Sequence, residues 1–474
     1  MSDAIEVWLD SDLMPLALVG TLTRGTKGIV RFQYAAEWLK NPLKFAIDPA
    51  TILDKGPFYP DNGMANFGAL LDSSPDRWGE TLMQRRESLA ALDEARAPRT
   101  LHAWDFLLGV QDLTRQGALR FRLPPAGEEA VQRPAVFLAC DDLPAPLLSS
   151  LGELEDVARE LTRKNITDLQ RLRRWLAVLV APGASLGGAR PKANFTDVDD
   201  TLWIAKFPAL DDTRDIGAWE KVTHDLALAA GVEVPEARLL TFNNEFRTFC
   251  VKRFDREPGQ RRFYSSAMTL LRKNIETGNE ASYLEIAEFI ANNCDPAYRS
   301  TDLEQMFRRV VFNVAVGNRD DHLRNHGFLY THAGWRLAKA FDVNPNIHKA
   351  EHVLRIDDQH HRASLALVKT TAAFYEVSDA RADTIIEEVA AVLDTWRDVA
   401  MRYRISQADI DLTASAFSAH AEFRTPGAKP ALPMAPRTRG TRSRARPGRP
   451  DDAAPHADAP EDDDSTAPLR PRGG

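Results

Sequence analysis

The sequence is poor in cysteine and has no long apolar run. Its 474 residues include only three cysteines, Cys140, Cys250 and Cys294, whose wide spacing fits neither a CxxC metal pair nor a disulfide framework. We therefore expect buried, reduced thiols in a cytoplasmic protein. No apolar stretch approaches the roughly 18 residues that a membrane-spanning helix needs, so we expect no transmembrane segment. The acidic start, MSDAIEVWLDSD, also lacks the basic and apolar regions of a signal peptide.

Charge is distributed unevenly along the chain. The net charge is −8, and residues 427–474 carry nine basic and seven acidic side chains, which leaves −10 for the rest. This tail holds nine of the 29 prolines and no aromatic, valine or isoleucine residue, so we expect it to be disordered. The acidic body argues against direct binding to nucleic acid. Two interpretations of the tail stay open, a solvated extension and an arginine-rich contact with nucleic acid that its own acidic block masks.

The hydrophobic pattern predicts an order of strands and helices. The first 125 residues combine short strand-like runs with a helix whose apolar face carries Trp78, Leu82 and Met83. The expected segments are strands at 5–9, 16–22 and 29–34, helices at 75–92, 151–161, 166–179 and 219–230, and a linker at 123–134. The chain after residue 265 is mainly helical in pattern. We therefore expect a small α+β region, then a strand-rich lobe, then a helical lobe.

The loop GNRDDHLRNHGF, residues 317–328, carries the strongest chemical signal. Asp320 and Asn325 have the spacing of the protein-kinase catalytic loop, in which the aspartate receives the proton of the substrate hydroxyl and the asparagine holds magnesium. Asp321 misses this spacing by one residue. The alternative is that these side chains only form a hydrogen-bonded turn.

The elements on either side of this loop support the kinase interpretation. The helix before it is expected to begin at a capping box of Thr301 and Glu304 and to end at Gly317. A hairpin after it would deliver Asp342, seventeen residues beyond Asn325. One Asp, one Asn and the phosphates of a nucleotide would make a sufficient magnesium site. The alternative for Asp342 is a simple turn cap.

A glycine-rich segment, GASLGGARPKANF, lies upstream. Gly183, Gly187 and Gly188 would allow close approach of the backbone to phosphate. The segment is not a Walker A motif, because Pro191 and Ala193 flank Lys192 where GK[ST] is required.

Lys206 follows in the strand-like run LWIAKF, a single ammonium group on an apolar element. The phosphates of a nucleotide would give this charge a partner, and Glu220 on the next helix would hold it as a helix glutamate holds the strand lysine of kinases. The alternatives are a lysine at a sheet edge that reaches solvent and a glutamate on a solvated helix surface. The order of these motifs along the chain, which is the order that phosphoryl transfer requires, favours the kinase interpretation.

Together these motifs resemble the HipA-type serine/threonine kinases, the toxins of bacterial type II toxin–antitoxin modules. The resemblance rests on VWLDSDLMPLALVGTL, RFQYAAEWL, SSPDRWGETLMQR, SLGGARPKANF, WIAKFP, VKRFDR, SYLEIAEFI, FNVAVGNRDDHLRNHGFL and GWRLAKAFDVNP. It spans residues 5–421, although residues 123–174 match no motif of the family and the tail lies outside its pattern. It implies an α+β, two-lobed protein-kinase-like fold with a strand-rich N-lobe, an extra N-terminal subdomain and an all-helical C-lobe. The implied boundaries are 1–125 for the subdomain, 126–254 for the N-lobe, 255–424 for the C-lobe and 425–474 for the disordered tail.

The resemblance also implies roles for individual residues. Asp320 would be the catalytic base, Asn325 and Asp342 would hold magnesium, and Ser185 would be the autophosphorylated serine whose phosphate ejects the glycine-rich loop and switches the kinase off. Residues 252–254 would hold adenine through their backbone. The implied ATP-binding residues are Gly187, Gly188, Ala189, Arg190, Lys192, Lys206, Lys252, Arg253, Phe254, His322, Asn325 and Asp342, with Glu220 paired to Lys206.

The cofactors implied by the resemblance are ATP and Mg2+. The implied substrate is a host translation protein such as an aminoacyl-tRNA synthetase, whose phosphorylation arrests growth. The implied partner is a small helix-turn-helix antitoxin, through which the kinase would reach operator DNA. Two further interpretations stay open: a small-molecule or lipid kinase with the same Asp-x4-Asn spacing, and a non-catalytic kinase fold that acts as a repressor partner.

Overall fold

The computed structural model describes residues 3–25, 28–61, 63–124, 136–139, 145–162, 176 and 190–425. Several predicted features lie outside these residues: Cys140, Gly183, Ser185, Gly187, Gly188, Ala189, the helix at 166–179, most of the linker and the tail. Cys250 and Cys294 are buried free thiols, as expected. Within the described part of the chain, no helix combines the length and the apolarity needed to cross a bilayer.

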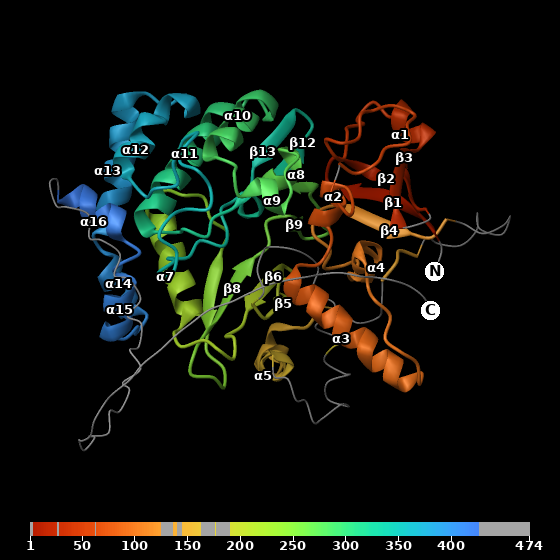
Figure 1. The fold of residues 1–474 in the computed structure, drawn as a ribbon, viewed down its shortest axis with the longest axis horizontal. Helices are drawn as coiled ribbons and strands as arrows, with labels where there is room; N and C mark the ends of the chain where they lie inside the picture. The colour runs from red at the N-terminus through yellow and green to blue at the C-terminus, as the bar shows by residue number, and fades with distance from the viewer. Residues whose placement is uncertain are drawn as a thin grey trace, which may run out of the picture. The chain divides into compact units, whose positions relative to one another are not determined.

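The N-terminal region, residues 3–124, is built on an antiparallel sheet of four strands in the order β3-β2-β1-β4 (Figure 1). The three predicted strands are present, and in the run VRFQY the residues alternate between buried and exposed, as a strand with one covered face requires. The strands are β1 (Ala4–Ser11), β2 (Met14–Arg24), β3 (Val30–Tyr34) and β4 (Leu119–Arg122). The helices are α1 (Ala36–Lys40), α2 (Gly68–Asp72), α3 (Arg77–Asp93) and α4 (Ala103–Gly109).

The second sheet has four antiparallel strands in the order β5-β6-β8-β7, so β6 is an interior strand. The run LWIAK of β6 is buried throughout, which is typical of a strand covered on both faces. The strands are β5 (Lys192–Thr196), β6 (Leu202–Lys206), β7 (Ala237–Leu240) and β8 (Thr248–Lys252). The predicted helices near them are present as α5 (Leu151–Thr162), preceded by the 3-10 helix η3 (Leu148–Ser150), and α7 (Ile216–Ala229).

Helix α3 joins the N-terminal region to this second sheet. The Asp76 side chain caps the helix by accepting a hydrogen bond from the Gly79 backbone N–H at 2.9 Å. The predicted apolar face, Trp78, Leu82 and Met83, is buried in one core with β5, β6 and α5. The start of α3 therefore lies against the strands that follow the glycine-rich segment.

Helix α11 (Arg299–Val316) is the central element of the C-terminal region, residues 264–425, and all its residues from Met306 onward are buried. The other helices there are α8 (Ala267–Leu270), α9 (Ile275–Gly278), α10 (Tyr283–Asn293), η4 (Leu323–Asn325), α12 (Leu365–Thr370), η5 (Ala372–Tyr375), α13 (Asp379–Leu393), α14 (Trp396–Arg402), α15 (Gln407–Thr413) and α16 (Ser418–Arg424). As predicted, α11 ends at Gly317, whose φ of 70° is left-handed. A Cβ at this position would lie 2.2 Å from the Ala416 carbonyl oxygen, so glycine is required.

The capping box expected at the start of α11 is wrong. The helix begins at Arg299, and Tyr298 at the cap position makes no side-chain hydrogen bond to it. Thr301 lies inside the first turn, and Glu304 instead accepts an ion pair at 2.6 Å from Arg381 of α13. The tertiary partner therefore takes the carboxylate that the local pattern assigned to a cap.

The expectation of an all-helical C-lobe also needs correction. The predicted hairpin is present as β12 (Gly327–Thr331) and β13 (Gly334–Leu337), and β11 (Tyr264–Ser266) pairs with β12 to make a three-stranded sheet. A lone hairpin is marginally stable in water, and a third strand together with the helical core covers its apolar residues. A small two-stranded ribbon, β9 (Arg256–Glu257) and β10 (Gln260–Arg261), precedes it.

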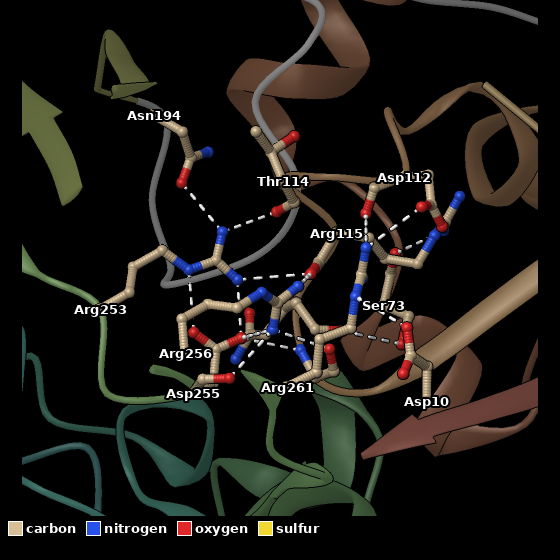
Figure 2. A network of polar contacts seen from close by, with 12 residues as sticks. Asp10, Ser73, Asp112, Thr114, Arg115, Asn194, Arg253, Asp255, Arg256 and Arg261 are labelled. Atoms are coloured by element: carbon tan, nitrogen blue, oxygen red, sulfur yellow. Dashed lines mark hydrogen bonds and ion pairs between the residues drawn. The ribbon is translucent and has the colours of Figure 1, made fainter. Parts of the chain in front are cut away.

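A network of buried arginines and aspartates joins the N-terminal region to the segment after β8 (Figure 2). Arg253 donates to the Asp255 carboxylate at 2.8 and 2.6 Å, to the Thr114 carbonyl at 2.6 Å and to Asn194 Oδ1 at 2.9 Å. Asp255 in turn accepts a hydrogen bond from the Gly117 backbone N–H at 2.8 Å. Buried charges with several partners each hold their segments in one geometry, because losing a partner leaves a charge unpaired.

Candidate active site

Lys206 lies at the end of the interior strand β6 and is buried. Its Nζ donates to Glu220 Oε1 at 2.5 Å and to Asp342 Oδ1 at 2.8 Å. Glu220 is buried as well, on helix α7, which packs against β7 and β8. Lys206 is therefore not a sheet-edge lysine that reaches solvent, and Glu220 is not a solvated surface residue.

The three charges in this contact affect one another. Burial lowers the pKa of Lys206, but Asp342 and Glu220 outweigh it and hold this pKa above its usual value. Burial raises the pKa of Asp342, and the Lys206 ammonium group outweighs it and holds this pKa below its usual range. Burial raises the pKa of Glu220, and the charge of Lys206 only partly offsets this. Asp342 is thus the carboxyl group of the pair that stays ionised.

The backbone of Asp342 is in the left-handed region, with φ of 58°. Aspartate adopts this conformation more readily than most residues, yet a non-glycine residue there still stores strain. The carboxylate bonds to Lys206, 136 positions away in sequence, rather than to the turn around it. The simple turn cap considered for Asp342 is therefore not what the structure contains.

Asp320 and Asp321 are neighbours in the loop after α11 but lie in opposite environments. The Asp320 side chain is 61% exposed and forms an ion pair with Lys349. The Asp321 side chain is 2% exposed. Its Oδ2 accepts hydrogen bonds from Tyr283 Oη at 2.7 Å and Asn313 Nδ2 at 2.8 Å and contacts His326 Nε2 at 2.8 Å. Asp321 therefore supports the loop, and Asp320 is the carboxylate that a substrate can reach.

Asn325 ends the short helix η4, and His322 directly precedes that helix. The Asn325 Oδ1 and His322 Nδ1 atoms are buried and make no hydrogen bond to any described residue. A buried polar atom without a partner costs about 1–3 kcal/mol, and such atoms mark places where a ligand completes the structure.

The donor set suits magnesium held together with a nucleotide. Asn325 offers a free amide oxygen and Asp342 an ionised carboxylate, which are the oxygen ligands that Mg2+ prefers. Among the described residues, no cluster of three or more His, Cys, Asp and Glu side chains is placed to bind a metal. A metal here would therefore depend on nucleotide phosphates for further oxygen ligands.

The segment 252–254 presents its backbone and one ring to the site. The Arg253 side chain is fully engaged in the network of Figure 2, so this residue can contribute to a ligand only through its backbone. The Phe254 ring lies 5.6 Å from the Phe341 ring, centroid to centroid. Phe341 packs with Ile204 and Val251, on a small apolar cluster that suits an adenine ring.

The two described residues at the end of the glycine-rich segment are held by carboxylates. Arg190 forms an ion pair with Asp212. Lys192 Nζ donates to Asp76 Oδ2 at 2.6 Å, and both side chains are 9% exposed. Trp78 Nε1 donates to the Lys192 carbonyl at 3.0 Å.

Sequence reasoning missed two of these partners, Lys349 of Asp320 and Asp76 of Lys192. Lys349 lies in an irregular segment with no motif, so no signal marks it. Asp76 lies in the run SSPDRWG, which supports the family resemblance and carries a helix-capping pattern, but nothing local connects it to Lys192.

A cavity of about 690 Å³ borders the catalytic loop at Arg324, the residue before Asn325. Its other walls come from α2, α3 and α4 of the N-terminal region and from α8 and α9. Its volume is within the range of sites that enclose a ligand.

Residues 184–396 match the family described as the HipA-like C-terminal domain. This part of the chain is a HipA-like C-terminal domain. It contains Lys206, Glu220, Asp320, Asn325 and Asp342, and the match confirms the resemblance seen in the motifs.

Two relatives of the HipA-like domain are named as kinases. A putative kinase of Haemophilus influenzae is 29% identical over 168 residues, which cover 31% of this chain and 48% of that protein. The serine/threonine-protein kinase toxin HipA of Shewanella oneidensis is 24% identical over 190 residues, which cover 34% of this chain and 43% of that protein. The chain thus spans about half the length of the curated relatives it matches.

A solved structure extends the likeness beyond the HipA-like domain. It contains S. oneidensis HipA with HipB and operator DNA, and it matches with a TM-score of 0.58 at 16% identity, over 88% of this chain and 97% of that chain. This likeness establishes the fold, which mixes helices and sheets as expected.

Proposed function

We propose that the protein is an ATP-dependent serine/threonine-protein kinase of the HipA type. The observation that carries the proposal is the contact of Lys206 with both Glu220 and Asp342. In protein kinases a strand lysine paired with a helix glutamate contacts the phosphates, and an aspartate after the catalytic loop binds the metal. Asp320 and Asn325 lie between them in sequence at the catalytic-loop spacing.

In the proposed reaction, Lys206 binds the phosphates of ATP, and Asn325 and Asp342 hold Mg2+. Bound magnesium would supply positive charge that stabilises the transferred phosphoryl group. Asp320 orients the hydroxyl group of a serine or threonine and receives its proton as the hydroxyl oxygen bonds to the γ-phosphorus and ADP leaves. Lys349 holds the Asp320 carboxylate until the substrate arrives. Adenine would pack on Phe341 and hydrogen-bond to the backbone of residues 252–254.

The proposal includes an off-switch at Ser185, which lies outside the described residues. By the family resemblance, its autophosphorylation would eject the glycine-rich loop from the nucleotide site. Ser185→Ala is then expected to remove self-inactivation and to deepen growth arrest on expression. Equal growth arrest with both proteins would contradict this role.

The substrate and partner of the proposal follow the family. We propose a host translation protein such as an aminoacyl-tRNA synthetase as substrate, whose acceptor segment would enter through the cavity beside Arg324. We also propose a small helix-turn-helix antitoxin as partner, since the solved S. oneidensis HipA is bound to HipB and operator DNA. A short helix-turn-helix gene directly upstream would support this arrangement.

Incubation of the full chain with γ-labelled ATP, Mg2+ and a host lysate tests the proposal. We expect label in protein, and we expect Asp320→Ala to abolish it. Asp358→Ala is a matched control, because Asp358 is an exposed loop aspartate outside the site. Label in metabolites or lipids instead would favour a small-molecule or lipid kinase. Growth arrest by Asp320→Ala equal to that of the unmodified protein would favour a non-catalytic repressor partner.

A further inference from the structure

Two buried lysines face each other across β5 and β6. Lys192 and Lys206 are directly opposite in the strand register, so their side chains leave the same face of the sheet. Both residues are buried, at 7% and 8% exposure. Like charges directly opposite on neighbouring strands repel, and burial strengthens this repulsion.

Separate carboxylates hold the two lysines. Lys206 contacts Glu220 and Asp342, whereas Lys192 contacts Asp76 at 2.6 Å. Asp76 does not belong to the sheet: it precedes α3 in the N-terminal region, and Trp78 in the first turn of α3 holds the Lys192 carbonyl. The first turn of α3 thus holds both the side chain and the backbone at the start of β5.

Asp342 lies within electrostatic reach of both lysines. Burial raises the pKa of Asp342, and the charges of Lys206 and Lys192 lower it. Without a charge at position 76, the buried Lys192 ammonium group would need another anion, and Asp342 is an ionised carboxylate in its reach. Asp342 would then hold two ammonium groups, which compete with a metal for the same oxygens.

We propose that Asp76 is a positioning residue of the nucleotide site, which keeps Lys192 apart from Asp342 and so leaves that carboxylate to Lys206 and the metal. This inference rests on the proposed function, since Asp342 is a metal ligand only there. It gives the N-terminal region a part in nucleotide binding, 116 positions upstream of Lys192.

Asp76→Asn in the full chain tests this role. Asparagine is as good a helix cap as aspartate, so the substitution removes the charge and keeps the start of α3. The measurement is calorimetric titration with a non-hydrolysable ATP analogue at a series of Mg2+ concentrations. We expect the Mg2+ concentration for half-maximal binding to rise about tenfold, the loss that corresponds to ~1.4 kcal/mol.

Two further variants separate positioning from simple destabilisation. Asp197→Asn is the matched control: Asp197 is a buried carboxylate paired with Arg238 just beyond the opposite end of β5, and its loss should leave the Mg2+ dependence unchanged. In the double variant Asp76→Asn/Lys192→Met, the displaced ammonium group is gone, so the Mg2+ dependence should return toward that of the unmodified protein.

The outcomes distinguish this inference from the proposed function. Analogue binding by the unmodified protein together with an unshifted Mg2+ dependence in Asp76→Asn would overturn the positioning role alone. A shift that persists in the double variant would overturn it too. Failure of the unmodified protein to bind the analogue at any Mg2+ concentration would overturn both proposals.

Discussion

The neighbouring aspartates of the catalytic loop should respond in opposite ways to the same substitution. Asp320→Ala removes an exposed carboxylate whose contact is with Lys349, so we expect the fold to persist and phosphoryl transfer to be lost. Asp321→Ala removes a buried acceptor that contacts Tyr283, Asn313 and His326, so we expect the fold to be lost first.

The structure sets the size of each effect. Each buried polar group left without its partner costs about 1–3 kcal/mol, so three of them predict a loss of about 3–6 kcal/mol for Asp321→Ala. That loss is comparable to the whole stability of a domain, about 5–15 kcal/mol. An exposed ion pair such as that of Asp320 contributes at most about 1 kcal/mol, whereas removing a general base lowers the rate about 10²–10⁴-fold.

Urea unfolding and label transfer from ATP measure the two effects separately. Asp321→Asn keeps one acceptor oxygen, so its loss of stability should be smaller than that of Asp321→Ala. The reasoning is refuted if Asp321→Ala unfolds at the same urea concentration as the unmodified protein. An Asp320→Ala protein that is folded and still transfers label at the full rate would refute the assignment of Asp320.

Three further predictions concern other parts of the fold. Glu220→Gln removes one of the two carboxyl partners of Lys206, so the KM for ATP should rise about tenfold, and an unchanged KM would count against the pairing as a phosphate-site element. Gly317→Ala places a Cβ against the Ala416 carbonyl and forces a left-handed alanine, so the free energy of unfolding should fall by at least about 2 kcal/mol in urea. Burial lowers the pKa of His352 to about 4, so the unfolded chain binds this proton more readily below about pH 6.5. Stability should therefore fall by about 2 kcal/mol between pH 7 and pH 5, and His352→Asn should reduce that fall; an equal fall in both proteins would contradict this cause.

Features that depend on neighbours in sequence were predictable. The alternation in VRFQY placed a strand with one buried face, and the apolar face of α3 was read from Trp78, Leu82 and Met83. The end of α11 was predictable because a glycine after a periodic apolar run relieves the left-handed conformation of a helix end. These features are decided within one or two turns of chain, where local sterics and burial dominate.

Pairings over long distances in sequence were not readable in the same way. The third strand, β11, joins a hairpin more than 60 positions later. Glu304 bonds to Arg381 rather than to a local cap, because a charged partner on a packed helix competes with the local hydrogen bond. The burial of Asp321 and the exposure of Asp320 depend on which side of the loop α10 and α11 cover.

The sequence by itself determined the chemical inventory of this protein: an acidic body with few cysteines, and the motifs of a HipA-like domain in the order that phosphoryl transfer requires. Only the tertiary structure decided which charges meet. Lys206 takes Glu220 and Asp342, and Lys192 takes Asp76 from a region that the sequence marks as separate. The physical reason is that a buried charge selects its partner by proximity and exclusion of water in the folded chain, and neither is written in the spacing of residues.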